Sequence, residues 1–275
     1  NQVPPHLMGP GSAQVRRPFP QFNNVAIAFP SLGVNSYHAG VVKVEKRFSH
    51  GVSFLGSYTW ARNIGNLDET GSGTLGDNQQ YQDYYNRRLD KGPMATDVVH
   101  RFVASALYDL PFGRNRRWLN SGAISRILGG WTIGSIMNMQ SGGPFTVTMQ
   151  TNTTNAFSAG ALRANVLHDP NLPAGERTLD RWFDTAAFEA PPQYAFGNAG
   201  RGILRADGRV NFDFSINKNF TFTERSYLQF RGELFNAFNH PDFGLPNRSM
   251  GSSGFGTITG ATDPRTVQLG LRFVF

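Results

Sequence analysis

One short stretch of the sequence carries most of the side chains suited to binding a ligand. Residues 79–88 read QQYQDYYNRR, which places three tyrosines and two arginines within ten positions. Tyrosine rings offer rigid faces with a hydroxyl, and neighbouring arginines suit carboxylates or phosphates. We therefore predict a ligand-binding loop, with packing of the loops against one another as the alternative. The candidate residues, including one from a second long loop, are Tyr81, Tyr84, Tyr85, Arg87, Arg88 and Trp182.

The other chemically suggestive patterns lack the context that catalysis or nucleotide binding requires. Residues 71–76 match G-x-G-x-x-G, but polar residues precede them and no apolar helix follows. The histidines show no paired spacing, and the absence of cysteine excludes thiol catalysis, Cys-ligated zinc and iron–sulfur clusters. Asp68, Glu69 and Asp83 share one loop, with no strand to hold the separation that two-carboxylate hydrolysis needs. We expect no enzymatic activity and no cofactor.

The composition favours strands and loops over helices. Charged residues make up only 16% of the 275 residues, against about 25% in a typical soluble domain, and 23 phenylalanines and 31 glycines are present. Such a composition is typical of strands joined by turns. The net charge is +7, and all but four of the 26 basic residues are arginines. Because the arginines are scattered along the chain, we expect no nucleic-acid partner.

Apolar and polar residues alternate with period two in seven segments, which predicts seven strands. Most are about ten to thirteen residues long, enough to cross a bilayer at a tilt. A soluble all-β domain also alternates and is the alternative. The predicted strands extend beyond the alternating stretches that identify them. These stretches are residues 42–48, 53–60, 101–108, 130–149, 210–217, 228–234 and 267–275. Aromatic residues that mark strand ends, as in an interfacial girdle, are Tyr37, Phe48, Trp60, Tyr108, Trp131, Phe220, Tyr227, Phe238 and Phe275.

The polar positions of these strands predict a water-facing side. In a large barrel they would line a wet lumen, and we expect cross-strand ion pairing to be their main role. The charged members are Lys43, Glu45, Arg47, Arg101, Asp213, Arg231, Glu233 and Arg272.

The connections between the predicted strands are unequal in length. Residues 49–51 and 221–226 are short turns, whereas residues 62–99, 150–208 and 239–264 are long and rich in Gly, Asn, Asp and Thr. Short turns at one end and long loops at the other are the layout of outer-membrane barrels. Strand directions alternate correctly only if 130–149 is a single strand with a bulge at Ser141–Pro144. Seven strands leave two open edges, which lipid does not tolerate, so we expect a part of a larger barrel.

Ten short motifs resemble, in order, the C-terminal barrel of TonB-dependent outer-membrane receptors of the Oar-like kind. Each motif alone is common, but the ordered set is specific and covers most of residues 36–275. The motifs are VKVEKRFSHG (42–51), SYTW (57–60), HRFVAS (100–105), YDLPFG (108–113), LGGW (128–131), QSGGPF (140–145), FGNAGR (196–201), LFNAFNHP (234–241), FGLPN (243–247) and FGTIT (255–259).

The resemblance implies a barrel of about 22 strands with a plug, which takes up large or scarce solutes. Residues 1–35 would then be an extracellular loop region, and residues 36–275 the C-terminal segment of the barrel. TonB would act through N-terminal parts that this sequence does not contain. A terminal aromatic residue on an alternating strand also resembles the signal that the barrel-assembly machinery recognises. The residues of that signal are Val267, Leu269, Leu271, Phe273 and Phe275.

The sequence therefore predicts a transmembrane β-barrel portion in the bacterial outer membrane, in contact with its lipid. The predicted function is uptake of an extracellular solute by a TonB-dependent receptor. The alternatives are a secreted or surface all-β module that binds carbohydrate, and an outer-membrane protein for adhesion or protein export.

Overall fold

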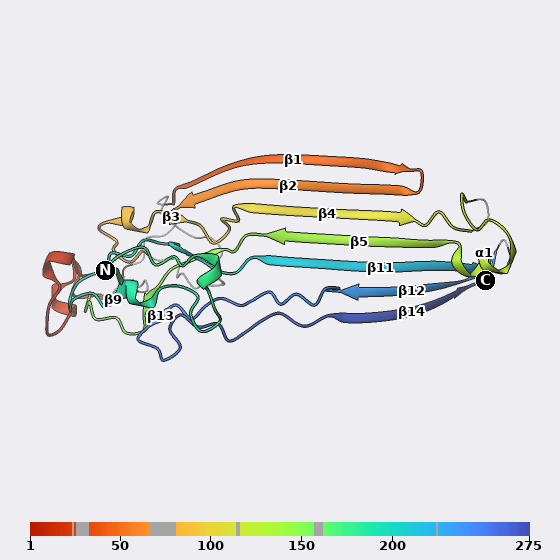
Figure 1. Cartoon of the computed structure of the whole chain (residues 1–275). Coiled ribbons are helices and arrows are strands. Elements are labelled where there is room, and N and C mark those ends of the chain that lie inside the picture. Colours follow the sequence, from red (N-terminus) through yellow and green to blue (C-terminus); the bar gives the residue numbers. More distant parts are fainter. Residues whose placement is uncertain (24, 26–32, 67–80, 114–115, 157–161, 224) are drawn as a thin grey trace.

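The computed structural model describes residues 1–23, 25, 33–66, 81–113, 116–156, 162–223 and 225–275. One antiparallel sheet dominates it, and the long strands lie side by side in chain order (Figure 1). A two-residue strand, β3 (Gly92–Pro93), pairs with the end of β2. The predicted antiparallel all-β fold of long strands is confirmed. The long strands are β1 (Asn35–Ser49), β2 (Val52–Gly65), β4 (His100–Asp109), β5 (Trp131–Gln140), β11 (Arg209–Thr221), β12 (Tyr227–Phe235) and β14 (Thr266–Val274).

The pairing register places most of the apolar residues of the long strands on one face. Side chains alternate between the two faces of a strand, so residues that pair across strands share a face. One row of paired residues crosses from β1 to β11 through Val44, Gly56, Ala104, Met137 and Phe212. The neighbouring row of the same parity continues to the far edge through Phe214, Leu234 and Val267.

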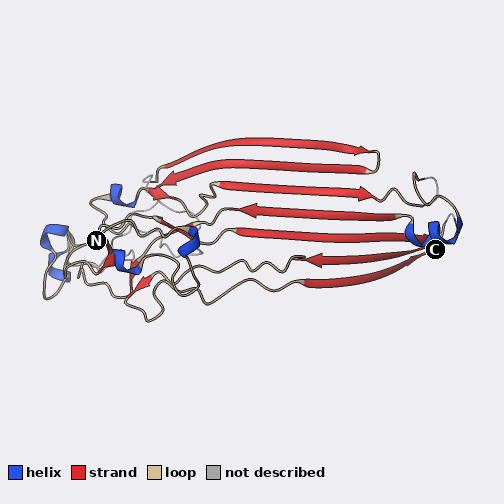
Figure 2. Cartoon of the chain, viewed as in Figure 1, coloured by secondary structure: helices blue, strands red, loops and turns tan. Residues whose placement is uncertain are grey.

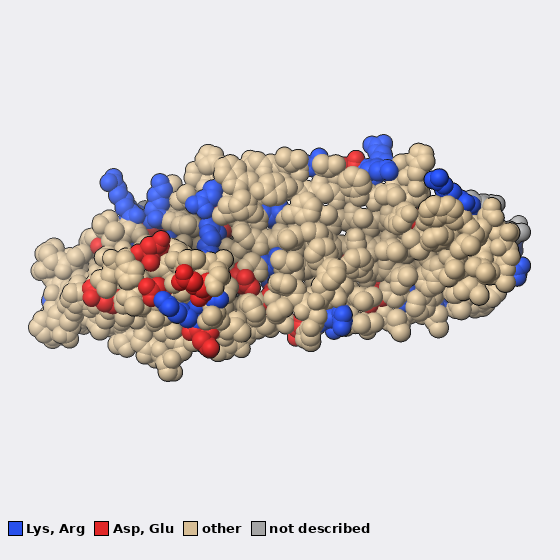
Figure 3. Space-filling model, in the orientation of Figure 1, with Lys and Arg blue, Asp and Glu red and all other residues tan. Residues whose placement is uncertain are grey.

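This apolar face is open rather than covered by a second sheet. Leu269 and Leu271 are each 70% exposed, and Val42 is 62% exposed. A soluble β-sandwich buries such side chains between its two sheets. The exposed face therefore argues against the soluble alternative and fits contact with hydrocarbon. In Figure 3, charged side chains gather over the loop end of the molecule and are sparse along the strands.

The two ends of the sheet differ in the length of their connections. At one end, His50 and Gly51 turn β1 into β2 with positive φ at both residues, and residues 222–226 join β11 to β12. At the other end, residues 66–99, 141–208 and 236–265 connect the strands (Figure 2). Outer-membrane barrels have short periplasmic turns and longer extracellular loops, so we call the two ends periplasmic and extracellular.

The single strand predicted over residues 130–149 was wrong in its extent, because β5 ends at Gln140. Gly142 lies so close to the Ala206 carbonyl that no side chain fits there, and Pro144 has no N–H to continue the ladder. The chain still crosses the sheet only once in this stretch, as the alternation of strand directions requires. The residues after β5 form small pairs: β6 (Pro144–Phe145) with β10 (Leu204–Arg205), and β7 (Thr148–Met149) with β13 (Ser249–Met250).

A short helix, α1 (Gly122–Leu128), lies in the β4–β5 connection, where the sequence analysis predicted no helix. The ammonium of Lys218 on β11 donates to the carbonyls of Arg126, Ile127 and Gly129, at 2.8 Å to the first and the last. A cation at a helix C-terminus satisfies free carbonyls and complements the helix dipole. Because so short a helix is unstable alone, this contact stabilises α1. No helix among the described residues is both long enough and apolar enough to span a membrane.

The long connections pack into a layer beyond the extracellular ends of the strands. We define this loop layer as the described residues of 1–34, 66–99, 141–208 and 236–265. Its further elements are β8 (Asn165–Val166), β9 (Phe188–Glu189) and the 3-10 helices η1 (Pro5–Leu7), η2 (Gln14–Arg16), η3 (Arg87–Asp90), η4 (Ala174–Glu176) and η5 (Thr185–Ala187).

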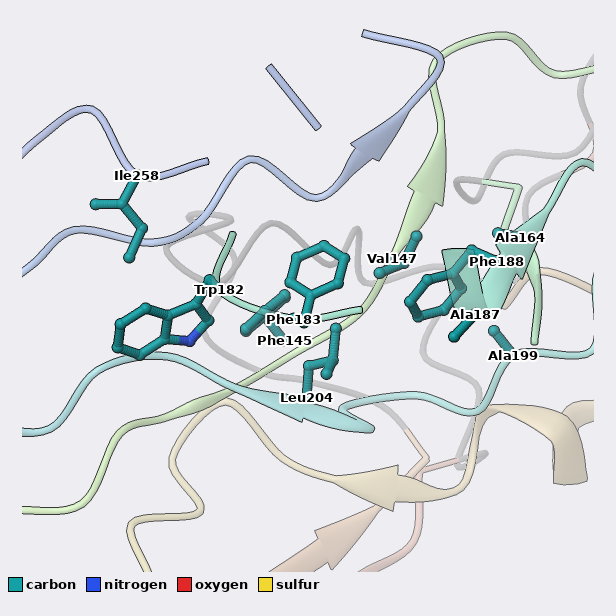
Figure 4. Close-up of a cluster of buried hydrophobic side chains, with 10 residues drawn as sticks. All are labelled: Phe145, Val147, Ala164, Trp182, Phe183, Ala187, Phe188, Ala199, Leu204 and Ile258. Carbon is teal, nitrogen blue, oxygen red and sulfur yellow. The ribbon is translucent and has the colours of Figure 1, made fainter. Parts of the chain in front are cut away.

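The loop layer has a hydrophobic core of its own (Figure 4). Phe183 lies at its centre, with its ring centroid 5.2 Å from that of Phe255 and 5.8 Å from those of Phe145 and Phe188. Residues from two long connections therefore share one core. The buried members are Phe145, Val147, Ala164, Trp182, Phe183, Ala187, Phe188, Ala199, Leu204 and Ile258.

The two faces of β11 give a direct test of the membrane assignment. Phe214 lies on the apolar face, and Ser215 lines the opposite face. We expect Phe214→Arg to lower the free energy of unfolding by about 2–4 kcal/mol, the cost of arginine at the bilayer midplane. Ser215→Arg should cost clearly less. Urea titration of the protein folded into vesicles measures both values, and equal losses would contradict the assigned faces.

The core of the loop layer can be tested separately from the sheet. Phe183→Ala removes the central ring, and we expect a cost of about 3–5 kcal/mol, as for other buried phenylalanines. Limited proteolysis should then cut the stretches 141–208 and 236–265 faster, while the strands stay protected. Leu167→Ala, at an exposed position of the same layer, is the matched control. Unchanged proteolysis in the Phe183 variant would show that the core does not hold the layer together.

Candidate functional site

The face opposite the apolar one contains a hollow of about 700 Å³. Side chains from β1, β2, β4, β5, β11 and β12 line it, so it extends across most of the sheet. In a closed barrel this face encloses the lumen. The hollow is therefore a portion of the luminal surface. The charged lining residues whose strand parity places them on this face are Lys43, Glu45, Arg47, Asp213 and Glu233.

The charged residues of this face do not form the cross-strand ion pairs that the sequence analysis predicted. Within the described residues, the one ion pair among the eight named positions joins Lys43 Nζ and Glu45 Oε2 at 3.2 Å, along a single strand. The register explains the difference, because Arg231 lies opposite Asn217 and not opposite a carboxylate. The Arg231 guanidinium accordingly donates to the Asn217 side chain at 3.4 Å. These charged side chains can therefore contact water and any molecule that enters the lumen.

Three aliphatic side chains on the same face give the hollow a partly apolar floor. Leu55, Leu107 and Ile136 all line the hollow, and all are exposed. Aliphatic groups on a luminal face have no packing partner within the sheet itself. A surface with both charges and aliphatic groups can contact a solute that has both kinds of group.

Asp97 connects the loop layer to the extracellular end of the sheet. Its carboxylate is buried and accepts hydrogen bonds from the Asn63 N–H at 2.6 Å and from the guanidinium of Arg62 at 3.3 Å. It also pairs with the guanidinium of Arg205, which donates to the Asp97 carbonyl at 2.9 Å. The end of β2 and strand β10 of the loop layer thus meet at one buried charge. Sequence reasoning missed this residue, because a lone aspartate in a loop has no distinguishing pattern.

A second buried network positions the stretch that carries the predicted ligand-binding residues. The side chain of Gln82 donates to the Gly197 carbonyl at 3.0 Å and accepts from the Arg163 N–H at 2.7 Å. Arg163 also pairs with Asp90 at 3.0 Å, and both side chains are buried. The Gln2 side chain donates to the Gln82 carbonyl at 2.8 Å. Residues near both ends of the 81–90 stretch are therefore fixed to the rest of the loop layer.

The predicted tyrosines and arginines lie on the surface between these fixed points. The Arg87 guanidinium lies 5.9 Å from the ring centroid of Tyr81 and 5.8 Å from that of Tyr84, within cation–π range. Tyr84 and Tyr85 are edge to face at 6.5 Å, and Arg88 is exposed. Burial raises the pKa of both Tyr81 and Tyr85. Both phenols are therefore neutral at physiological pH and can donate a hydrogen bond.

Trp182, the sixth predicted ligand-binding residue, lies within the hydrophobic core of the loop layer. Its indole N–H donates to the Arg205 carbonyl at 2.9 Å, and the Arg177 guanidinium lies 5.6 Å from its ring centroid. Burial among other loop residues is what the alternative interpretation, packing of the loops against one another, predicts for this residue. The ligand-binding role of the tyrosines and of the two arginines stays a prediction.

Two histidines of the loop layer each form a pair with a carboxylate. His168 Nε2 lies 3.0 Å from Asp184 Oδ2, and His240 Nδ1 lies 3.7 Å from Asp242 Oδ1. Among the residues that the structure describes, no three of His, Asp and Glu gather where they could hold a metal ion. Asp184 also accepts the Ala186 N–H at 3.2 Å and so caps η5. The hydrogen bond from His168, with those from Ala186 and Arg181, lowers the pKa of Asp184.

The residues of the predicted assembly signal lie on the exposed side of the last strand. Val267, Leu269, Leu271 and Phe273 share the apolar face of β14, and Phe275 beyond it is exposed. Within the described residues, β14 pairs only with β12, so its other edge carries no strand. The recognition of these residues by the barrel-assembly machinery stays a prediction.

A comparison with protein families identifies this two-faced sheet and its loops together. The model of a family described as outer membrane beta barrel domain matches residues 1–268. The match includes the N-terminal segment, the loop layer and the long strands as far as the start of β14. Comparisons with curated proteins and with solved structures gave no match.

Acid should loosen the stretch around Asp184. Because the folded-state pKa of this carboxyl lies below its usual value of 3.8, its stabilising effect is complete above pH 3.8 and is lost as the pH falls through the lower folded value. We expect pepsin to cleave residues 165–190 faster as the pH falls below 3.8. Asp184→Asn should be cleaved at one relative rate at every pH, and Asp180→Asn, at a neighbouring carboxylate, should behave as the wild type. Acid sensitivity that persists in the Asp184→Asn variant would assign the effect to another group.

Proposed function

The chain belongs to the outer membrane beta barrel domain family and resides in the bacterial outer membrane, and on this premise we propose that it is part of a TonB-dependent receptor. In this proposal the sheet supplies part of the barrel wall, and the loop layer forms part of the extracellular mouth. The receptor takes up a large or scarce extracellular solute. The chain has no catalytic role.

The observation that carries the proposal is the luminal hollow beneath an ordered loop layer. A barrel that only admits small polar solutes needs a water-filled lumen and no folded layer over it. Here the loop layer has an aromatic core and two buried charge networks, centred on Asp97 and on Gln82 with Arg163. Such order fixes side chains at the mouth, and fixed side chains favour binding of a particular solute.

The open edges of the sheet support a barrel larger than the described strands. Within the described residues, β1 and β14 each pair with one neighbour only. Unpaired backbone groups in hydrocarbon are costly, so further strands must pair with both edges. Strands from a longer chain would complete a plugged barrel of about 22 strands. TonB would act on the parts of the receptor that this sequence does not contain.

The tyrosines and arginines of residues 81–88, which are exposed or partly exposed, are the proposed first contact with the solute. Arg87 is held by two rings, and the Tyr85 hydroxyl donates to the Gln2 carbonyl at 3.0 Å, so both side chains are already ordered. Preordered side chains lose less conformational entropy on binding. Guanidinium and aromatic groups together suit a solute with anionic groups and flat apolar faces.

Growth of deletion strains tests the proposal, because it distinguishes uptake from adhesion and export. We expect a strain that lacks the full-length protein to lose growth on one member of a panel of scarce iron, peptide and glycan sources. A strain that lacks TonB should lose growth on the same source, because the uptake needs energy. Arg87→Gln with Arg88→Gln should raise the source concentration needed for half-maximal growth, whereas Arg225→Gln, at the opposite end of the sheet, should not.

The adhesion and export alternatives predict a different pattern. A strain without the protein would then lose surface attachment or a secreted protein, and deletion of TonB would leave both unchanged. That pattern would overturn the proposed uptake while leaving the outer-membrane location intact.

A further inference from the structure

The lipid-facing side of the sheet carries a charged residue at its periplasmic end. Lys218 has the same parity on β11 as Phe214 and Phe220, and its cross-strand partners are Trp131 and Phe230. A lysine that faces lipid pays a large desolvation cost unless it is paired or reaches water. Yet Lys218 is only 2% exposed, so something covers it.

The cover is the C-terminal end of α1. The Lys218 ammonium donates to three carbonyls of residues 126–129 and lies 5.1 Å from the ring centroid of Trp131. The Trp131 indole N–H donates to the Ile127 carbonyl at 3.1 Å. Two side chains of the lipid-facing side therefore hold the end of α1. It follows that this end of the helix lies outside the barrel wall, over the apolar face.

The side of α1 that the protein leaves uncovered is apolar. Ile124, Ile127 and Leu128 follow one another at i, i+3 and i+4, and all three are exposed. Ser125, which lies beside this apolar stripe on the helix, is buried. A helix on the surface of a soluble domain has the reverse arrangement, with its apolar side covered. This arrangement is the one that suits a helix in contact with lipid.

Basic and aromatic residues precede this apolar side closely in the sequence. Trp118 and Leu119 are exposed beside the helix in sequence, and the Arg117 guanidinium lies 5.6 Å from the ring centroid of Trp118. Arg116 pairs with Asp109 at 3.0 Å. Arg117 and Arg126 are exposed and have no ion pair among the described residues. Tryptophan and arginine next to aliphatic residues are typical of segments at a membrane interface.

We propose that residues 116–128 are a membrane-interface anchor that lies in the periplasmic leaflet of the outer membrane and binds anionic phospholipid head groups. Its apolar side continues the lipid-facing surface of the sheet, so the same bilayer that meets Phe230 and Leu271 reaches it. Arg117 and Arg126 supply the charge that attracts anionic head groups. Lys218 fixes the anchor to the barrel wall.

A fluorescent label at position 124 tests the insertion of the anchor. The sequence contains no cysteine, so Ile124→Cys in the full-length protein, with any cysteine elsewhere replaced, gives one site for bimane. The protein is reconstituted in equimolar phosphatidylcholine and phosphatidylglycerol, with bromine on the acyl chains of one lipid. We expect strong quenching at position 124. His50→Cys, in the β1–β2 turn at the same end, is the control and should stay in water and show little quenching.

Exchange of the brominated lipid tests the choice of head group. Brominated phosphatidylglycerol should quench the position-124 label more than brominated phosphatidylcholine, which corresponds to preferred binding of the anionic lipid. Arg117→Gln with Arg126→Gln should reduce that preference by about fivefold for each arginine removed. Arg47→Gln, an arginine change on the luminal face, should leave the preference unchanged.

Two results would overturn the proposal. A label at position 124 that reports water in every vesicle would exclude insertion, and in that case a cross-link from the same cysteine to a periplasmic protein in cells would assign the surface to a protein partner. Equal quenching by the two brominated lipids would exclude binding of anionic head groups. Neither result depends on which solute the barrel transports, so failure here leaves the proposed uptake untouched.

Discussion

The fold depends on one constraint, which is that the backbone hydrogen bonds keep the side-chain alternation of every long strand in phase. A shift of one residue at any pairing would move a whole strand's apolar side chains to the luminal face. The registers of the described residues from β1 to β14 keep this phase along the strands, and the one register shift among them lies at the periplasmic end of β1, between Lys46 and Ser49. Because the phase is kept, one surface matches hydrocarbon and the other is left for water and charge. The luminal hollow and the lipid contact are both consequences of this phase.

The loop layer is stabilised by a different kind of interaction from the sheet. One face of the sheet contacts lipid and the other contacts water, so the sheet buries few side chains. The loop layer, in contrast, buries aromatic rings around Phe183 and charged side chains such as Asp97 and Arg163. Buried charges are costly unless they are paired and hydrogen-bonded, and both of these have partners from distant stretches of the chain. Loss of one partner would leave a charge unsatisfied. The layer therefore has only a small number of stable arrangements, as a surface that selects a solute requires.

The sequence predicted what depends on local periodicity, and failed where contacts between distant residues decide. Alternation located all seven long strands, and the unequal connections predicted which end carries the long loops. The extent of β5 was wrong, because the close approach of Gly142 to the Ala206 carbonyl has no local signature. Trp182 was named as a candidate ligand contact from its residue type, but its neighbours in space include Arg205 and the loop core. Asp97 and Gln82 gave no signal, because their partners lie far away in the sequence.

Lys218 shows that a departure from a pattern can be as informative as the pattern. In β11 the apolar parity runs through Val210, Phe212, Phe214 and Ile216, and the next position is a lysine. On a lipid-facing surface, an ammonium that does not reach water needs hydrogen-bond acceptors from outside the wall, since the sheet itself offers only side chains there. The carbonyls at the end of α1 meet that need. Thus the lysine on the apolar parity of β11 and the unpredicted helix have one explanation, in which the ammonium and the helix carbonyls satisfy each other.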